Sequence, residues 1–418
     1  MQFALDILHT VTDNTNASSA IGPKTWLRVA FTMFVIGFGA NLFAPMLQVY
    51  RQYDGMSDAS VTLMFAVYAA GLVPALIAFG PMSDRLGRRA ILRPAVLLSA
   101  AGSIILALGV TGVEVLLYIG RWIAGFAVGM AMASGAAWIK QLSLFQPTAG
   151  PRRATIAVSA GFGGGPFVAG CVTEFLPFEH VLPFIVHLVL VALVLPWMWT
   201  APETQPRMGT PSDGKARQPR ARRVLVPKVT LSSQFLWAVA AWAPWVFGTV
   251  TVAFTTLPTQ VEVEWPMFFI GAVAFVALGT GVAIQPAAAL FLERSRPQWL
   301  PLSVLGLGSA CAGMLTAAVT VYTQQVWLVF VAAVFLGAAY GVMMVAGLSE
   351  VEMLASADDL GALIGVFYAL TYIGFFVPFA LSLIAPLVGM MTCLLFGAVV
   401  CLVSMVPVAR VAARAAAG

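Results

Sequence analysis

A short charged segment between two long apolar runs constrains the fold of this chain more than any other feature. The segment reads Gly80-Pro81-Met82-Ser83-Asp84-Arg85-Leu86-Gly87-Arg88-Arg89, and the apolar runs Val61–Phe79 and Ala90–Val110 flank it. A helix of about 20 apolar residues crosses the hydrocarbon core of a bilayer. Backbone polar groups in lipid must be hydrogen bonded within their own segment, which favours helices over strands. The pattern therefore predicts a tight turn that joins two membrane helices.

The composition of the whole chain excludes an ordinary water-soluble protein. Charged residues make up 9% of the sequence, against about 25% in soluble domains, and the mean hydropathy is +0.93. The cysteines lie singly inside apolar runs, a spacing that fits neither a disulfide framework nor a metal site. The three histidines are not clustered with acids, so no catalytic constellation is visible. We expect a membrane protein that is not an enzyme and that uses no metal or other cofactor.

Apolar runs separated by charged or Pro/Gly-rich breaks predict twelve helices. The predicted helices begin near Leu27, Ser60, Ala90, Val115, Ala154, Val181, Leu231, Trp265, Trp299, Val326, Gly361 and Val388. One long basic segment, 201–230, separates the sixth helix from the seventh. We expect an N-terminal tail over 1–25, a six-helix half over 26–200, the linker 201–230, and a second six-helix half over 231–418. The predicted fold class is an all-α membrane protein.

The distribution of basic residues predicts the orientation. Of the 22 lysines and arginines, 20 fall on one side of the predicted spans, and only Arg51 and Arg121 do not. Loops rich in Lys and Arg stay in the cytoplasm, so both termini are expected there, in a multi-pass plasma-membrane protein. The net charge of +5 then follows from topology, and no nucleic-acid partner is needed to explain it. No basic start followed by an apolar run opens the chain, so no cleaved signal peptide is expected.

The two halves match each other at a constant offset. Gly125 and Gly337 lie 212 positions apart, and five further pairs share that offset. These pairs are Gly129 with Gly341, Met132 with Met344, Gly135 with Gly347, Pro166 with Pro378, and Pro74 with Pro286. Six matches over three helix pairs indicate a duplicated six-helix unit. A parallel repeat of this kind is typical of transporters whose binding site lies between the halves, near the middle of the membrane.

The charged segment resembles the loop signature of the major facilitator superfamily, Gly-x-x-x-Asp-Arg-x-Gly-Arg-(Arg/Lys). The matching residues are Gly80, Asp84, Arg85, Gly87, Arg88 and Arg89. Any short cytoplasmic loop tends to be basic, so the glycines and the aspartate at fixed offsets carry the resemblance. It implies a conformational gate in which the arginines face Asp358 and Asp359, at the start of the eleventh helix. The signature occurs only in the first half, because Arg296 and Pro297 stand at the equivalent positions of the second.

A glycine-rich run in the fifth helix resembles a second signature of the family. Gly161, Gly165, Pro166 and Gly170 match Gly-x-x-x-Gly-Pro-x-x-x-Gly, which is seen in the exporting, antiporter branches. Glycines allow helix backbones to approach closely, and a proline inside a helix removes one backbone donor. Plain close packing of small residues is the alternative interpretation.

Arg121 is the single residue most in need of explanation. It opens Arg-x-x-x-Gly-x-x-x-Gly in the fourth helix, which is similar to another antiporter signature, although Ala124 stands where the family more often has Gln. An arginine at the centre of a membrane helix costs about 2.5–3.5 kcal/mol, so it needs a partner or water. Glu174 and His187 lie at a similar predicted depth. We expect Glu174 and Arg121 to take part in proton coupling, and His187 to lie at the membrane interface near the headgroups.

In this superfamily the first, fourth, seventh and tenth helices line the central cavity, together with parts of their neighbours. The resemblance suggests as cavity residues Asn41, Met130, Trp242, Trp245, Phe254, Tyr340, Met344, Tyr368 and Tyr372. Aromatic and methionine side chains suit a lipophilic, loosely specified ligand. The first helix has Asn41 and Ala44-Pro45 where many drug antiporters have an acid or a fuller proline motif, so coupling through that helix is not expected.

The sequence as a whole predicts a twelve-helix major facilitator transporter. It looks most like the proton-coupled exporters of drugs and metabolites, with a small-molecule substrate, protons as the coupling ion, the bilayer as its surroundings, and a monomeric state. Two alternatives stay open: an uptake symporter or facilitator for a sugar or organic acid, and a lipid flippase on the same fold.

Overall fold

The chain is helical throughout the part described by its computed structural model, which covers residues 22–143, 145–146, 149–204, 227–294, 302–356 and 359–417. No strand occurs within these ranges. Twelve of the described helical segments are long and apolar enough to cross a membrane. The predicted helix count and fold class are therefore confirmed.

The spans begin within four residues of the predicted positions, except that the predicted start of the ninth span, at Trp299, lies outside the described residues. The spans of the first half are α2 (Trp26–Asn41) with α3 (Phe43–Gln52), α4 (Asp58–Leu86), α5 (Arg88–Ala107), α6 (Glu114–Leu142), α7 (Gly150–Phe175) and α8 (Leu182–Trp199). Those of the second half are α9 (Ser233–Phe235) with α10 (Ala243–Thr251), α11 (Pro266–Arg294), α12 (Leu302–Thr323), α13 (Val326–Leu354), α14 (Leu360–Tyr372) with α15 (Val377–Val388), and α16 (Met390–Ala417).

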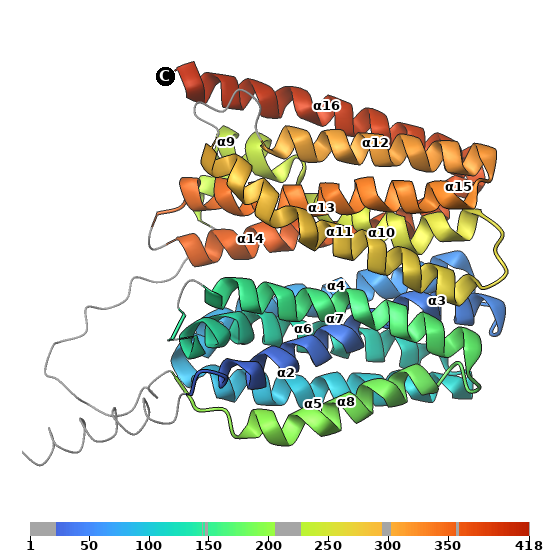
Figure 1. Cartoon of the computed structure of the whole chain (residues 1–418). Coiled ribbons are helices and arrows are strands. Elements are labelled where there is room, and N and C mark those ends of the chain that lie inside the picture. Colours follow the sequence, from blue (N-terminus) through green and yellow to red (C-terminus); the bar gives the residue numbers. More distant parts are fainter. Residues whose placement is uncertain are drawn as a thin grey trace, which may run out of the picture.

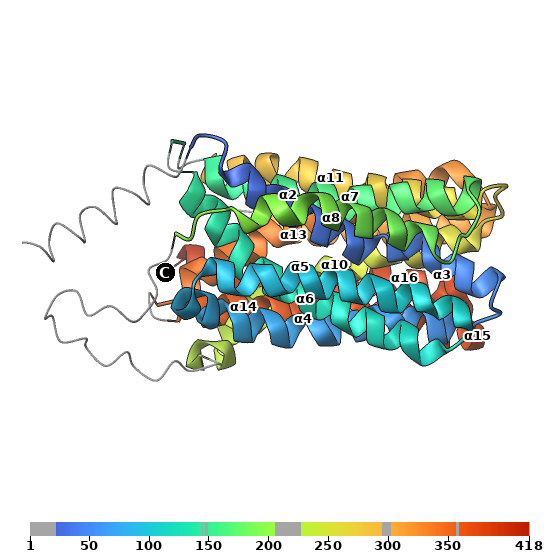
Figure 2. The same cartoon turned by 90° about the horizontal axis from the view of Figure 1, so that it is seen from below.

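The helices gather in two groups. In Figure 1, α2 to α8 form the lower group and α9 to α16 the upper group, and their long axes run in nearly the same direction. Figure 2, turned by 90°, shows the same common axis from the side of the first group. We call the end where α4 ends and α5 begins the basic end, and the other end, where α3 and α15 finish, the far end. The basic end lies at the left of both figures.

Three spans are interrupted, and prolines accompany each interruption. The first span breaks at Leu42, three residues before Pro45. The seventh span contains two π-helical turns, Leu236–Ala240 and Val252–Thr256, with Pro244 between them. The eleventh span narrows to a 3-10 turn over Ile373–Phe376, just before Pro378. Proline lacks the backbone N–H that an unbroken helix needs, and π-turns in membrane helices are often found at functional sites.

The glycines of the sequence repeat make equivalent contacts in the two halves. A Cβ atom added at Gly125 of α6 would lie 2.0 Å from the carbonyl oxygen of Tyr68 in α4, and one at Gly337 of α13 would lie 2.1 Å from that of Ala277 in α11. One turn further on, Gly129 and Gly341 show the same closeness to α4 and α11. In each half, the fourth helix of the unit therefore packs directly on the backbone of the second.

Candidate functional site

The two halves meet closely at the far end. Thr62 of α4 and Ser382 of α15 bring their hydroxyl oxygens to 3.1 Å. The ring of Phe65, one turn further along α4, lies 6.0 Å from the rings of both Phe254 and Phe375 in the second half. These contacts join the start of α4 to the seventh and eleventh spans. The far end is therefore closed in this structure.

Glu174 adds a polar contact between the halves at the same end. Its Oε2 atom accepts hydrogen bonds from the backbone N–H groups of Met267, at 2.8 Å, and Phe268, at 3.2 Å. These N–H groups belong to the first turn of α11, which lacks intrahelical acceptors, and the positive end of the helix dipole favours a carboxylate there. Glu174 of α7 thus caps a helix of the other half.

Arg121 and Glu174 lie at a similar predicted depth but contact different helices. The Arg121 side chain is completely buried. Its Nη1 donates to the carbonyl oxygen of Ala40 at 2.9 Å, and its Nε donates to that of Met64 at 3.4 Å. Nη2 has no hydrogen-bond partner among the described residues. The Ala40 carbonyl is available because the first span breaks at the next two residues.

Aromatic rings complete the surroundings of the guanidinium group. Its central carbon lies 4.2 Å from the ring centroid of Phe43, 4.5 Å from that of Tyr68 and 5.4 Å from that of Phe65. Such cation–π contacts contribute about 2 kcal/mol or more when water is excluded. With the two carbonyl acceptors, they offset the cost of burying the charge without a carboxylate. Arg121 makes no ion pair among the described residues.

From the three rings around Arg121, a continuous set of aromatic contacts extends into the second half. Tyr68 contacts Phe375 at 5.7 Å, Phe375 contacts Tyr372 at 5.4 Å, and Tyr372 stacks on Phe247 at 4.5 Å. Tyr340 continues the set, 5.5 Å from Phe247. Tyr368 lies 6.5 Å from Tyr372. We call these five residues, Phe247, Tyr340, Tyr368, Tyr372 and Phe375, the aromatic array.

The array faces the first half and is more open toward the basic end. The hydroxyl of Tyr372 points at the sulfur of Met132 in α6, 3.8 Å away. Tyr372 is 2% exposed, whereas Tyr368, one turn nearer the basic end, is half-buried. The array therefore closes the boundary toward the far end and presents its accessible side toward the basic end.

The predicted cavity residues fall into separate groups. Tyr340, Tyr368 and Tyr372 belong to the aromatic array, and Phe254 belongs to the far-end closure. The amide of Asn41 donates to the carbonyl of Phe162 in α7, so it holds two helices of the first half together. Met130 and Met344 are both buried.

The two predicted cavity tryptophans contact residues of their own half in this structure. Trp242 is completely buried, donates from its indole to the carbonyl of Ala238, and lies against Phe367 of its own half. Trp245 reaches toward Gly397 of α16. A role for either tryptophan in substrate binding stays a prediction.

Sequence reasoning missed Phe247 and Phe375. A signal for Phe375 was present, because Tyr368, Tyr372 and Phe375 follow the i, i+4, i+7 spacing of one helix face. Phe247 carries no comparable signal, since the π-turns on either side of it disturb the helical period.

The predicted position of His187 is also wrong. It is completely buried inside the first half rather than exposed at the interface. Its Nδ1 lies 2.7 Å from the hydroxyl of Ser103, and its Nε2 lies 3.4 Å from that of Ser99, both in α5. A Cβ at Gly39 of α2 would come within 2.3 Å of the imidazole, so the glycine provides the space that the ring occupies.

The glycine signature of α7 makes backbone contacts on two faces. A Cβ at Gly161 would lie 2.2 Å from the carbonyl oxygen of Phe34, and one at Gly165 would lie 2.4 Å from that of Phe38, both in α2. A Cβ at Gly170 would lie 2.6 Å from the carbonyl oxygen of Met267 in α11. The signature therefore joins α7 to its own half through two glycines and to the other half through a third.

Replacing Gly161 by alanine is expected to lower the melting temperature of the purified protein. Overpacking of this kind costs about 1–3 kcal/mol, because the added methyl group would meet a backbone atom that cannot rotate away. Gly164→Ala is the matched control, since a Cβ there meets nothing within 4 Å. Thermal unfolding in detergent would measure both, and equal melting temperatures for the two variants would contradict the proposed contact.

In the loop signature, the described contacts of Arg88 and Arg89 stay within the first half. Arg88 is buried and its Nη2 lies 2.8 Å from the carboxylate of Asp84, while its Nη1 donates to Ser83. Arg89 donates to the carbonyl of Ala201, after α8. Gly87 forms the turn with a φ of +98°, a conformation that favours glycine. A Cβ at Gly80 would meet nothing within 4 Å, and Arg85 is exposed.

Glu203, which follows α8, holds this loop although it is not part of the signature. Its two carboxylate oxygens accept from the backbone N–H groups of Arg88, at 3.1 Å, and Arg89, at 2.8 Å. It therefore caps the N-terminus of α5, as Glu174 caps that of α11.

Asp358 lies outside the described residues. Asp359 accepts from the hydroxyl of Ser356 at 2.8 Å, a contact within the second half. Contact between the arginines and this pair of acids stays a prediction for a state with the basic end closed.

Comparison with known proteins is consistent with this architecture. The family model "Major Facilitator Superfamily" matches residues 29–323. The tetracycline resistance protein, class D, of Salmonella ordonez is 26% identical over 80% of this chain and 82% of its own length. The quinolone resistance protein NorA of Staphylococcus aureus (strain MRSA252) is 24% identical, over 54% of this chain and 57% of its own length.

Solved transporter structures share the fold. A point-mutant form of a peptide transporter POT superposes with a TM-score of 0.75 at 15% identity, over 94% of this chain and 95% of that chain. A POT family transporter in complex with 5-aminolevulinic acid gives a TM-score of 0.72 at 12% identity, over 92% and 95%. At these identities the similarity concerns the fold alone. With the family model matching most of its length, this chain belongs to the major facilitator superfamily of membrane transporters.

Proposed function

We propose that the chain is a proton-coupled exporter of small lipophilic molecules or metabolites. In this proposal the basic end faces the cytoplasm, as the positive-inside rule predicts. The two halves rock about the boundary and expose it to each side in turn.

The observation that carries the proposal is the aromatic array. Two of its rings, Tyr372 and Phe375, contact the first half, and its half-buried member, Tyr368, lies one turn nearer the basic end. Ring faces and the nearby Met132 sulfur offer a large apolar surface with few directional hydrogen bonds, which suits lipophilic ligands of varied shape. A substrate entering from the cytoplasm would meet this surface first.

The relatives and the glycine signature support export as the direction. The two similar proteins named above carry tetracycline and quinolone resistance in their names, and Gly161, Gly165, Pro166 and Gly170 match the signature of exporting branches. We assign proton coupling to Arg121 and Glu174. A proton that moves down 100 mV and one pH unit supplies about 2.3 plus 1.4 kcal/mol, enough to drive a steep substrate gradient.

Uptake or facilitated transport of a sugar or organic acid is the second candidate. It is favoured by the absence of an acidic residue from the first span, residues 26–52, where many drug antiporters carry one.

Transport into inverted membrane vesicles would test the proposal. We expect tetracycline and a quinolone to accumulate when the vesicle lumen is acidic, and the accumulated compound to leave when the pH gradient is collapsed. Vesicles without the protein are the control. Entry that is unaffected by the pH gradient and stops at equal concentrations would support the facilitator, and no transport of either compound would reject export of these classes.

A further inference from the structure

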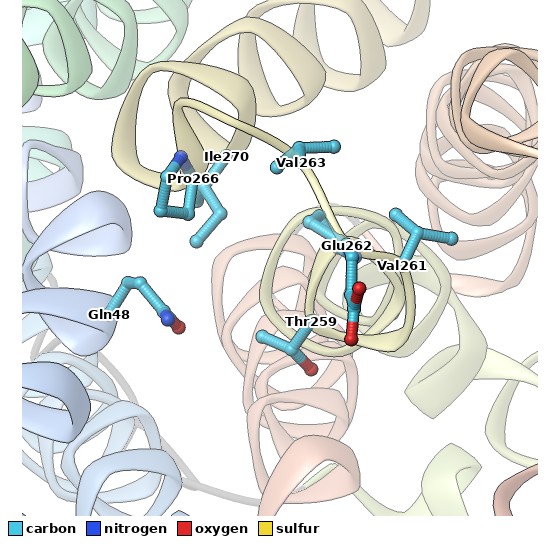
Figure 3. Close-up of a pocket in the computed structure, with 8 residues that line it drawn as sticks. Gln48, Thr259, Val261, Glu262, Val263, Pro266 and Ile270 are labelled. Atoms are coloured by element: carbon cyan, nitrogen blue, oxygen red, sulfur yellow. The ribbon is translucent and has the colours of Figure 1, made fainter. Parts of the chain in front are cut away.

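A second pocket lies at the far end, apart from the aromatic array. It has a volume of about 390 Å3 and is bounded by both halves. Gln48 of α3 contributes the wall from the first half. The second half contributes Thr259, Glu262, Val263, Pro266 and Ile270, which belong to the end of the seventh span, the loop after it and the start of α11. Figure 3 shows Gln48 facing Thr259 and Glu262 across the opening.

Three side chains bring hydrogen-bond acceptors to this pocket, and the Gln48 amide also carries a donor nitrogen. The Oε1 atom of Gln48 is buried and has no hydrogen-bond partner among the described residues. The Thr259 hydroxyl donates to the carbonyl of Thr256 at 2.8 Å and accepts from the side-chain amide of Gln260 at 3.1 Å, so one of its two lone pairs remains for a ligand. Glu262 is exposed and makes no ion pair among the described residues. A donor group placed between Gln48 and Glu262 would therefore satisfy the unpartnered Gln48 oxygen and the carboxylate together.

The charge of the far end favours a cation as that donor. The described far end carries one arginine, Arg51, which is paired with Asp58 at 2.6 Å. Its acidic residues are Asp54, Asp58, Glu114, Glu174, Glu179, Glu262 and Glu264. A surface with one predominant sign of charge raises the local concentration of ions of the other sign. The apolar wall of Val263, Pro266 and Ile270 favours a ligand that also carries an apolar body.

We propose that this pocket binds a lipophilic amine, whose ammonium group bridges Gln48 of the first half and Glu262 of the second. Its apolar body would lie on Pro266 and Ile270 of α11, the helix whose first turn is already held by Glu174. The site is distinct from the aromatic array and is reached from the far side of the membrane.

The geometry gives the bound amine a defined effect on the protein. Both walls of the pocket are in place only when the far end is closed, because they belong to different halves. A ligand shifts an equilibrium toward the state that it binds better. The amine therefore stabilises the closed far end, and it inhibits transport from the far side without being carried.

Binding of dansylcadaverine, a fluorescent primary amine, to the full chain in lipid nanodiscs would test the proposal. We expect Glu262→Gln to raise the dissociation constant at least about tenfold, because a hydrogen bond to a charged group is lost. Gln48→Leu, which removes the acceptor of the first half, is expected to raise it about threefold or more. Glu264→Gln is the matched control, since Glu264 lies in the same loop but outside the pocket lining. N-butyl dansylamide, which has the same dye without the amine, should bind at least about tenfold more weakly than dansylcadaverine.

The outcomes distinguish binding in this pocket from binding by the general surface charge and from binding at the transport site. Equal weakening by Glu262→Gln and Glu264→Gln would assign binding to the general charge of the far end and overturn the proposal. Unchanged affinity in Glu262→Gln would overturn it as well, and would place the amine elsewhere, such as at the aromatic array. Locking the far end shut with a disulfide between positions 62 and 382 should leave dansylcadaverine affinity unchanged or higher, and a loss of binding would contradict the bridging geometry. None of these readings requires tetracycline or quinolone transport, so the proposal can fail or succeed independently of the proposed export.

Discussion

A double variant, Thr62→Cys with Ser382→Cys, is expected to lose transport on oxidation and to regain it on reduction. The two hydroxyl oxygens lie 3.1 Å apart across the boundary between the halves, a separation from which two sulfur atoms can close to the bonded distance of about 2.05 Å. Because alternating access requires α4 and α15 to separate at the far end, the cross-link should reduce turnover to the level of empty proteoliposomes. Substrate flux before and after dithiothreitol measures the effect.

Each single-cysteine variant, treated with the same oxidant, serves as the control and should transport normally. The native cysteines stay in place, since Cys311, Cys393 and Cys401 are buried and Cys171 is half-buried. Transport at the reduced rate by a protein whose cross-link is verified by mass spectrometry would show that the far end does not open between these helices.

Arg121→Gln is expected to lower transport driven by a pH gradient about 100-fold, which corresponds to about 2.7 kcal/mol. Glutamine can still donate to the carbonyl of Ala40, so the helices should remain packed, but the positive charge enclosed by Phe43 and Tyr68 is gone. Counterflow, in which labelled substrate exchanges for unlabelled substrate without a gradient, should be retained. The two assays together separate coupling from folding.

Arg51→Gln is the matched control, because it removes an arginine that pairs with the exposed carboxylate of Asp58 and does not contact the surroundings of Arg121. Surface ion pairs of this kind contribute about 0–1 kcal/mol, so this variant should transport almost normally. Gradient-driven transport by Arg121→Gln at the wild-type rate would rule out a role for this arginine in coupling, and loss of counterflow as well would make its role structural.

The fold was predictable because a membrane helix can be recognised from the hydropathy along the sequence. Length and hydropathy alone located the spans, since lipid requires each apolar segment to satisfy its own backbone. The sequence repeat was predictable for a related reason: Gly125 and Gly337 meet a carbonyl oxygen at nearly the same distance, so neither half can tolerate a side chain there.

Which neighbouring helix a side chain faces was harder to predict. Arg121 and Glu174 lie at similar predicted depths, but depth does not tell which neighbour a helix face meets. Arg121 faces α2 and α4, whereas Glu174 faces α11. His187 was assigned to the interface because the sequence does not show that Gly39, nearly 150 residues earlier, leaves space for its ring.

In the seventh span, an irregular helix makes predictions from the helical period fail. Trp242 and Trp245 follow a π-helical turn over Leu236–Ala240. A π-turn contains one residue more than an α-helical turn, so every later side chain is rotated from the face that a regular period assigns to it. The span therefore directs Phe247, and not these tryptophans, toward Tyr372.

The contact between Gly170 and Gly271 has a mechanical consequence. A Cβ at Gly271 would lie 2.5 Å from the carbonyl oxygen of Pro166, and the Cα of Gly170 is 3.3 Å from the same point. Two helix backbones touch here with no side chains between them, whereas helix pairs elsewhere interlock by setting ridges into grooves. Interlocked ridges resist sliding, and no ridge stands at this point, although the rings of Phe167 and Phe268 pack beside it. We therefore expect the two halves to pivot at this crossing of α7 and α11 when the contact between Thr62 and Ser382 opens.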